Sequence, residues 1–168
     1  MKSNLILIGM PGVGKSTVGV LAAKLLAKKF VDTDLVIQER ENASLSHLIR
    51  THGVDGFCKM EERHILSLKL QNTVVATGGS AVYSSAAMQH LQSAGVIVHL
   101  ELPCAELESR LDDLASRGVV IPPGVSLAEL YREREPLYRR WGELTIDCRG
   151  KSQIQVAAEL ADSDVNNA

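Results

Sequence analysis

The sequence predicts an α/β fold with three layers, in which helices cover both faces of a mostly parallel central sheet. Two observations indicate this fold. Short, uninterrupted aliphatic runs recur along the chain, and such runs are typical of strands that are buried on both faces. Longer segments with helical spacing of apolar residues separate them, and strands that alternate with helices form parallel sheets. A length of 168 residues favours a single domain, spanning residues 1–168.

The first half of the chain opens with the clearest strand. Residues 4–8, NLILI, form an aliphatic run that ends at a glycine. The next segment, residues 16–29, has apolar side chains three and four positions apart and lysines on the other side, which predicts an amphipathic helix. Further strands are predicted at residues 30–31 and 73–76. Further helices are predicted at residues 35–40, 44–52 and 59–70.

The second half continues the alternation. Strands are predicted at residues 96–100 and 144–146, and helices at residues 84–93, 105–114, 127–140 and 154–160. Residues 117–124, RGVVIPPG, contain two prolines and two glycines and are predicted to form a loop. The polar tail, residues 161–168, is expected to fray.

Composition excludes several classes of function. The net charge of −2 and an aromatic content of 4% argue against a nucleic-acid partner. No segment reaches the roughly 18 consecutive apolar residues that span a bilayer. The three cysteines, Cys58, Cys104 and Cys148, are widely spaced and odd in number, so we expect free thiols in a reducing compartment and a cytoplasmic protein. The histidines do not fall in a metal-ligand spacing.

A phosphate-binding motif follows the first predicted strand. Residues 9–16 fit the pattern G-x-x-x-x-G-K-[ST] of the P-loop, between a strand and a helix as the pattern requires. Its glycines let backbone N–H groups turn towards phosphate oxygens, and the following helix adds its positive end. Lys15 is expected to reach the β- and γ-phosphates, and the Ser16 hydroxyl to contact Mg²⁺. The residues expected to contact ATP in this segment are Gly12, Val13, Gly14, Lys15, Ser16 and Thr17. A glycine turn that merely carries this sequence is the structural alternative.

The P-loop does not identify the group that accepts the phosphate. A GTPase would need an N-K-x-D motif to read its base, and the chain has none; motor ATPases need a longer chain. Four other segments are more specific: FVDTD (30–34), GFCKMEE (56–62), ATGGSAV (76–82) and REPLY (134–138). In this order they resemble the shikimate kinase family over nearly the whole chain. The resemblance implies a P-loop kinase fold with a mobile lid at about residues 112–124. It also implies a role in aromatic amino acid biosynthesis.

The resemblance implies roles for residues that bind the acceptor. Asp34 would accept hydrogen bonds from the acceptor's hydroxyls and assist removal of the attacking hydroxyl's proton. The amides of Gly78 and Gly79 would approach the acceptor, and Arg134 would grip its carboxylate as a two-pronged donor. The acceptor is therefore expected to be a small hydroxylated carboxylic acid. Ordinary turns and a surface arginine are the alternatives for these positions.

The resemblance also assigns the nucleotide side. Asp32 would hold a water molecule of the Mg²⁺ shell. Arg117 would lie in the lid and neutralise charge that develops on the phosphates during transfer. Arg110 would stack on adenine, although a solvated charge on a helix is the simpler alternative. The expected cofactors are ATP and Mg²⁺.

Three positions depart from the family's pattern. Cys58 stands where the family has an arginine that helps to clamp the acceptor's carboxylate, which leaves Glu61 without its usual partner. Losing one charge-assisted contact costs roughly 1.5–3 kcal/mol, so we expect weaker binding of shikimate. Ser80 replaces a glycine and would be strained if the position requires positive φ. The third departure is in the lid, where Arg117 is followed by Gly-Val-Val.

Two alternative functions remain open from the sequence. The chain is either a kinase for another small metabolite or for a nucleoside monophosphate, or a nucleotide-binding protein without catalytic activity. Both alternatives rest on Cys58, because the departures concern the acceptor while the nucleotide motif is intact. The sequence does not predict an oligomeric state.

Overall fold

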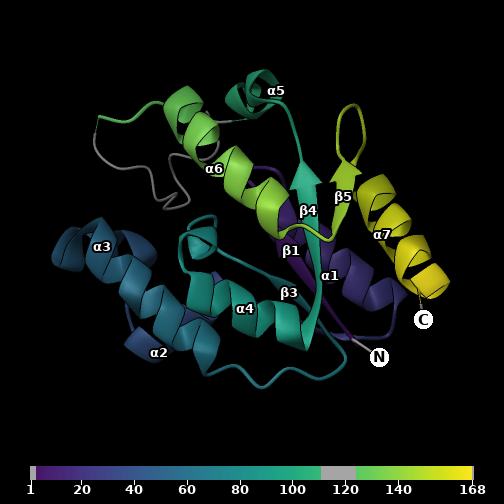
Figure 1. Ribbon diagram of the computed structural model, residues 1–168, viewed down its shortest axis with the longest axis horizontal. Coiled ribbons are helices and arrows are strands. Elements are labelled where there is room, and N and C mark those ends of the chain that lie inside the picture. Colours follow the sequence, from purple (N-terminus) through teal and green to yellow (C-terminus); the bar gives the residue numbers. More distant parts are fainter. Residues whose placement is uncertain (1–2, 111–123, 168) are drawn as a thin grey trace.

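A computed structural model describes residues 3–110 and 124–167 and contains a five-stranded parallel sheet (Figure 1). Its strands are β1 (Asn4–Ile8), β2 (Lys29–Asp32), β3 (Thr73–Ala76), β4 (Gly95–Glu101) and β5 (Leu144–Asp147). They lie in the order β2-β3-β1-β4-β5, and all four pairings are parallel. The predicted fold class is confirmed.

Helices cover both faces of this sheet. They are α1 (Lys15–Leu25), α2 (Thr33–Glu41), α3 (Leu45–Leu66), the short 3₁₀ helix η1 (Ala81–Tyr83), α4 (Ser85–Ala94), α5 (Cys104–Ser109), α6 (Leu127–Trp141) and α7 (Gln153–Asn167). Helices α1 and α7 pack against each other, while α4 and α6 both contact β4 (Figure 1). Helices α2 and α3 contact each other and lie to one side of the sheet.

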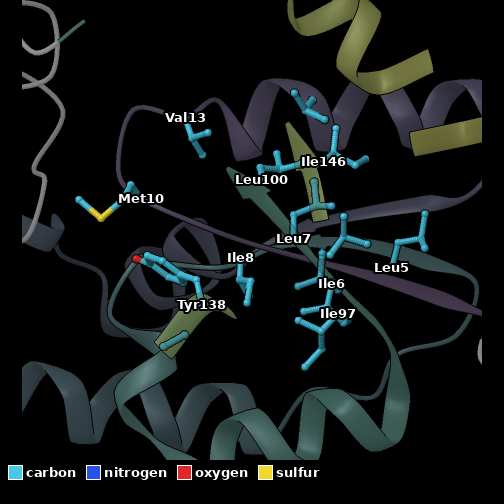
Figure 2. Close-up of a cluster of buried hydrophobic side chains, with 14 of the residues drawn as sticks. Leu5, Ile6, Leu7, Ile8, Met10, Val13, Ile97, Leu100, Tyr138 and Ile146 are labelled. Carbon is cyan, nitrogen blue, oxygen red and sulfur yellow. The ribbon is translucent and has the colours of Figure 1, made fainter. Parts of the chain in front are cut away.

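The central strand β1 is buried along its whole length, as its aliphatic sequence predicts. Ile6 and Ile8 point to one side of the sheet, with Ile97 and Tyr138, whereas Leu7 points to the other, with Leu100 (Figure 2). Because successive side chains of a strand alternate between faces, the unbroken apolar run from Leu5 to Ile8 fits a strand that is covered on both faces. Among the described residues, no helix has the length and apolar character needed to cross a membrane.

Several predicted boundaries are wrong. The helix predicted at residues 16–29 ends at Leu25, because Ala27 adopts a left-handed conformation (φ 51°) and Lys29 already pairs in the sheet. The helices predicted at 44–52 and 59–70 form one element, α3, which kinks at Gly53 (φ 71°, ψ 175°) and ends at Leu66.

The end of the chain also differs from expectation. Helix α7 continues through residues 161–167, which were expected to fray. Its inward-facing residues Val156, Ala157 and Leu160 are buried and anchor the helix, and the Ser163 hydroxyl donates to the Glu159 carbonyl in the next turn. The predicted lid, residues 112–124, lies outside the described residues except for Gly124.

Candidate active site

The loop between β1 and α1 has the geometry of a phosphate cradle. Gly9, Gly12 and Gly14 all adopt positive φ, at 146°, 85° and 104°. A Cβ atom on Gly9 would lie 2.6 Å from the Leu100 carbonyl oxygen, so this turn requires glycine. Gly14 is the N-cap of α1 and has no side chain that could satisfy the helix's first N–H groups. These N–H groups carry the positive end of the helix dipole and suit an anion.

Lys15 is the first residue of α1 and is 8% exposed. Its ammonium group donates to the carbonyl oxygens of Gly9 (2.7 Å) and Met10 (3.0 Å). Burial lowers the pKa of Lys15 to about 8, although the carboxylate of Asp34 opposes this shift. Two neutral carbonyls offset only part of the cost of burying an ammonium group. A polyanion such as the triphosphate of a nucleotide is therefore a suitable partner for Lys15.

Ser16 and Asp32 form a pair of oxygen ligands beside the loop. The Ser16 hydroxyl donates to Oδ2 of Asp32 at 2.6 Å. Oδ1 of Asp32 accepts from the backbone N–H of Asp34 at 2.9 Å and thereby caps α2. Hydroxyl and carboxylate oxygens are the ligands that Mg²⁺ prefers, directly or through water. The predicted metal-binding residues are thus neighbours and fit such an ion.

Asp34 and Gly78 lie together on the other side of the cradle. A Cβ atom on Gly78 would be 2.8 Å from Oδ1 of Asp34 and 2.3 Å from Oε1 of Glu61, so only glycine fits between these carboxyl groups. Burial is the main cause that raises the pKa of Asp34 to about 6, and the neighbouring Asp32 adds to the effect. Asp34 is therefore mostly ionised at neutral pH and close to the pH range in which it can exchange a proton.

The amide of Gly78 has a partner within the protein. Its N–H group donates to the Thr33 hydroxyl at 3.0 Å, so this group is engaged within the protein in the structure. Thr33 is 1% exposed and holds the turn after β3 against the start of α2. The contact of this amide with the phosphoryl acceptor stays a prediction.

Arg134 faces the same turn from α6 and is 2% exposed. Its Nη1 atom lies 2.9 Å from the position of a Cβ on Gly79. Its Nε–H donates to the Tyr83 hydroxyl at 3.0 Å, and its guanidinium carbon lies 5.1 Å from the centre of the Tyr83 ring. The Tyr138 hydroxyl donates to the Gly79 carbonyl at 2.8 Å. Arg134 is therefore a buried cation beside the Gly78-Gly79 turn, and not the surface arginine that the charged helix sequence also allowed.

The departure at Ser80 has a structural explanation. Ser80 has φ −87°, so the position does not require glycine and the expected strain is absent. Its hydroxyl donates to Oε2 of Glu61 at 2.6 Å. Sequence reasoning missed this pair, although a new hydroxyl and a carboxylate without its usual partner were both visible in the sequence. Cys58 is half-buried and supplies no charge; burial raises the pKa of its thiol, and Glu61 adds to the shift.

Glu61 is consequently a buried carboxyl with only one satisfied oxygen. It is 1% exposed, and its Oε1 atom has no hydrogen-bond partner among the described residues. Burial raises the pKa of Glu61 to about 7; the Ser80 hydrogen bond opposes this rise and Asp34 adds to it.

The raised pKa of Glu61 predicts a pH-dependent cost to stability. A carboxyl with a raised pKa favours the folded state when protonated, so its contribution is lost as the pH rises from about 4.5 to about 7. The Glu61→Gln variant lacks this loss. We expect its free energy of unfolding, relative to the wild type, to rise by about 3 kcal/mol between pH 4.5 and pH 8. Urea denaturation across this pH range measures the difference; a difference that does not change with pH would refute the burial argument.

The remaining predicted residues are less informative. Val13 is 2% exposed and its N–H donates to the Met10 carbonyl at 3.3 Å, whereas Thr17 is exposed on α1. Arg110 follows α5 and is half-buried. Burial raises the pKa of Cys148 to about 11, and Arg110 is among the cations that oppose this rise. Arg117 lies outside the described residues.

Comparisons with known proteins show the family of this chain. A family model described as shikimate kinase matches residues 11–164. A shikimate kinase of Pasteurella multocida is 36% identical over 165 residues, which cover 96% of this chain and 94% of that protein. A solved shikimate kinase from Acinetobacter baumannii in complex with shikimate is 28% identical with a TM-score of 0.86, covering 98% of this chain and 93% of that one. The shikimate kinase of Aquifex aeolicus is 28% identical with a TM-score of 0.83, covering 98% and 97%.

Proposed function

Because the chain belongs to the shikimate kinase family, we propose that it transfers the γ-phosphoryl group of ATP to a hydroxyl group of shikimate. Kinases of this family are phosphotransferases that use ATP and an alcohol acceptor. One observation supports the acceptor most strongly. Asp34 and Arg134, an anion that can bind hydroxyls and a cation that can bind a carboxylate, flank the same Gly78-Gly79 turn beside the phosphate cradle.

Lys15 and Asp34 have different roles in the proposed reaction. Lys15, which bonds to loop carbonyls, would turn its ammonium group to the β- and γ-phosphate oxygens. Asp34 would hold the attacking hydroxyl in line with the phosphoryl group and take its proton as the new bond forms. The transition state of phosphoryl transfer is loose, so orienting the hydroxyl matters more than the strength of the base.

Magnesium is proposed at Ser16 and Asp32. The Oγ atom of Ser16 and the Oδ2 atom of Asp32 are 2.6 Å apart. A small rotation of the two side chains would separate these atoms and leave both available to the ion or its waters. Bound there, the ion would neutralise phosphate charge. Loss of the Ser16 hydrogen bond would leave Asp32 held by the N–H group of Asp34, so the cap of α2 would survive metal binding.

Several further assignments are part of the same proposal. The chain would form one kinase domain, with residues 112–124 as the lid, Arg117 over the phosphates and Arg110 beside adenine. The amides of Gly12, Val13 and Gly14 and the hydroxyl of Thr17 would complete the nucleotide site. Consumption of ATP and three free thiols support a cytoplasmic location.

Among the described residues, one arginine, Arg134, would bind the acceptor's carboxylate, because Cys58 supplies no charge. We therefore expect Arg134→Lys to raise KM for shikimate about 10- to 100-fold, since lysine keeps the charge but loses the planar fork and the bond to Tyr83. The change in kcat should be smaller. Arg132→Lys, an exposed arginine on the same helix, is the matched control. Equal effects of the two variants would refute the carboxylate role of Arg134.

The proposed function is tested by ADP release with purified protein, ATP and Mg²⁺. Shikimate, gluconate and nucleoside monophosphates are supplied separately. We expect shikimate to stimulate ADP release and the others not to. Stimulation by another acceptor alone would indicate a different small-molecule kinase. ATP binding without stimulation by any of them would indicate a nucleotide-binding protein without kinase activity.

A further inference from the structure

We propose that Tyr83 is a positioning residue, whose hydroxyl and ring hold the guanidinium group of Arg134 in the orientation that receives the acceptor's carboxylate. This inference rests on the proposed kinase function and deepens it, because it explains how the one arginine is prepared for its ligand. Tyr83 is the last residue of η1, which packs against α6. It acts through Arg134 and does not itself touch the acceptor.

Two contacts join the Tyr83 side chain to Arg134. The Nε–H group of Arg134 donates to the Tyr83 hydroxyl at 3.0 Å, and the guanidinium carbon lies 5.1 Å from the centre of the ring. The hydrogen bond fixes one edge of the guanidinium, and the ring restricts its tilt. Because the guanidinium is planar, both constraints also set the direction of its Nη atoms. Nη1 lies 2.9 Å from the position of a Cβ on Gly79 and thus faces the turn after β3.

Glu133 sets the direction of the Tyr83 hydroxyl. This hydroxyl donates to Oε1 of Glu133 at 2.7 Å. A phenol has one hydrogen, so once Glu133 accepts it, the oxygen lone pairs are left for Arg134. The hydroxyl therefore accepts from the Nε–H group instead of turning its own hydrogen towards the cation. Two linked hydrogen bonds thereby connect Glu133, Tyr83 and Arg134.

Core packing does not account for Tyr83. Its side chain is 38% exposed, whereas Ala81 and Val82 of the same short helix are buried. An aromatic ring that is left this exposed gives up part of the stabilisation that full burial supplies. Its position does provide the contacts with Arg134 and Glu133. Orienting the cation therefore explains why a tyrosine suits this place.

The orientation of Arg134 has no substitute at Cys58. A second arginine there would hold the carboxylate even if Arg134 turned away, but the thiol of Cys58 carries no such charge. A side chain that is already ordered before binding loses less conformational freedom when the ligand arrives. Tyr83 thus raises the affinity for a carboxylated acceptor by ordering Arg134 in advance.

The first test is a double-mutant cycle between Tyr83 and Arg134. Tyr83→Phe keeps the ring and removes the hydroxyl, so we expect KM for shikimate to rise about 3- to 10-fold, the usual effect of one hydrogen bond, with little change in kcat. In Arg134→Met, which has no donor for this hydroxyl, the same substitution should cause no further loss of kcat/KM. An equal loss in both backgrounds would overturn the inference, because Tyr83 would then act without Arg134.

Controls exclude a general effect of losing a tyrosine hydroxyl. Tyr131→Phe, at a half-buried position on α6, is the matched control and should keep the wild-type KM for shikimate. Binding of a fluorescent ADP analogue should be the same in the wild type, Tyr83→Phe and Tyr131→Phe. A loss of nucleotide binding in Tyr83→Phe would mean that Tyr83 supports the fold as a whole and would overturn a specific role in positioning.

The second test does not depend on turnover. ¹⁵N NMR follows the Nε–H group of Arg134, whose signal is identified by its loss in Arg134→Met. We expect this proton to exchange with water about tenfold faster in Tyr83→Phe than in the wild type, because its acceptor is gone. Unchanged exchange would overturn the inference. If the wild type does not phosphorylate shikimate, the proposed function fails, while the exchange rates still decide whether Tyr83 holds Arg134.

Discussion

Replacing Lys15 with methionine is expected to lower kcat/KM for ATP by about 10³-fold, the loss typical of removing a preorganised donor to a transition state. Lys15 is the buried cation at the start of α1, 8% exposed and bonded only to the carbonyls of Gly9 and Met10 among the contacts of its ammonium group in the described residues. Methionine has a similar length and fills the same space without the charge. ADP release in a coupled assay measures the change.

The free energy of unfolding of Lys15→Met should rise, although its activity falls. Burial lowers the pKa of Lys15 to about 8, so the charged form is disfavoured in the folded protein and the full cost applies below pH 8. At pH 7 we expect Lys15→Met to unfold with a free energy up to about 3 kcal/mol higher than the wild type. Lys24→Met, exposed on the same helix, should change neither quantity. Loss of both activity and stability would mean that Lys15 is structural.

The second large effect is expected for Asp34→Asn. Asparagine keeps the size of the side chain but can neither take a proton nor hold the hydroxyl with a charge, so kcat should fall about 10²- to 10⁴-fold. KM for ATP should change little, because Asp34 lies on the acceptor side of the loop. The variant Glu39→Gln, an exposed carboxyl on the same helix, is the control. Retention of more than a tenth of the wild-type kcat would contradict the role of Asp34.

The pH profile adds a second test of the same residue. A carboxyl with a raised pKa is ionised only above that value, so wild-type activity should fall as the pH drops. The pKa of Asp34 is raised to about 6 and that of Glu61 to about 7, chiefly by burial. Since the two groups meet at Gly78, the acid limb should show apparent pKa values of the pair. In Asp34→Asn one step should disappear, and the remaining step should lie below about 7, because Asp34 raises the pKa of Glu61.

The nucleotide side could be predicted from the sequence because its chemistry depends on the backbone. A buried aliphatic strand, three glycines and a following helix fix the loop locally, and Gly9, Gly12 and Gly14 have the positive φ angles that such a turn requires. The proximity of Ser16 and Asp32 also followed from the strand ends, because parallel strands bring their carboxyl ends to one edge of the sheet. The family was predicted from four short motifs, and the comparisons confirm it.

The acceptor side was only partly predictable because it depends on contacts between distant segments. The Ser80 hydroxyl bonds to Glu61, 19 residues earlier, so neither departure from the family pattern indicates this bond by itself. The engagement of the Gly78 amide by Thr33 likewise spans 45 residues. The burial of Arg134 against Tyr83 could not be predicted, because the sequence of its helix is rich in charges and typical of a surface helix. Tertiary packing decided each of these three cases.

The most direct measurement of the central claim is ³¹P NMR of the protein with ATP, Mg²⁺ and shikimate. The account predicts that the γ-phosphate signal is replaced by one new phosphate monoester, in equal amount to the ADP formed. It also predicts that Asp34→Asn binds ATP but forms the monoester at least 100-fold more slowly. Release of inorganic phosphate alone, or unchanged ATP in the presence of protein that demonstrably binds it, would contradict the account.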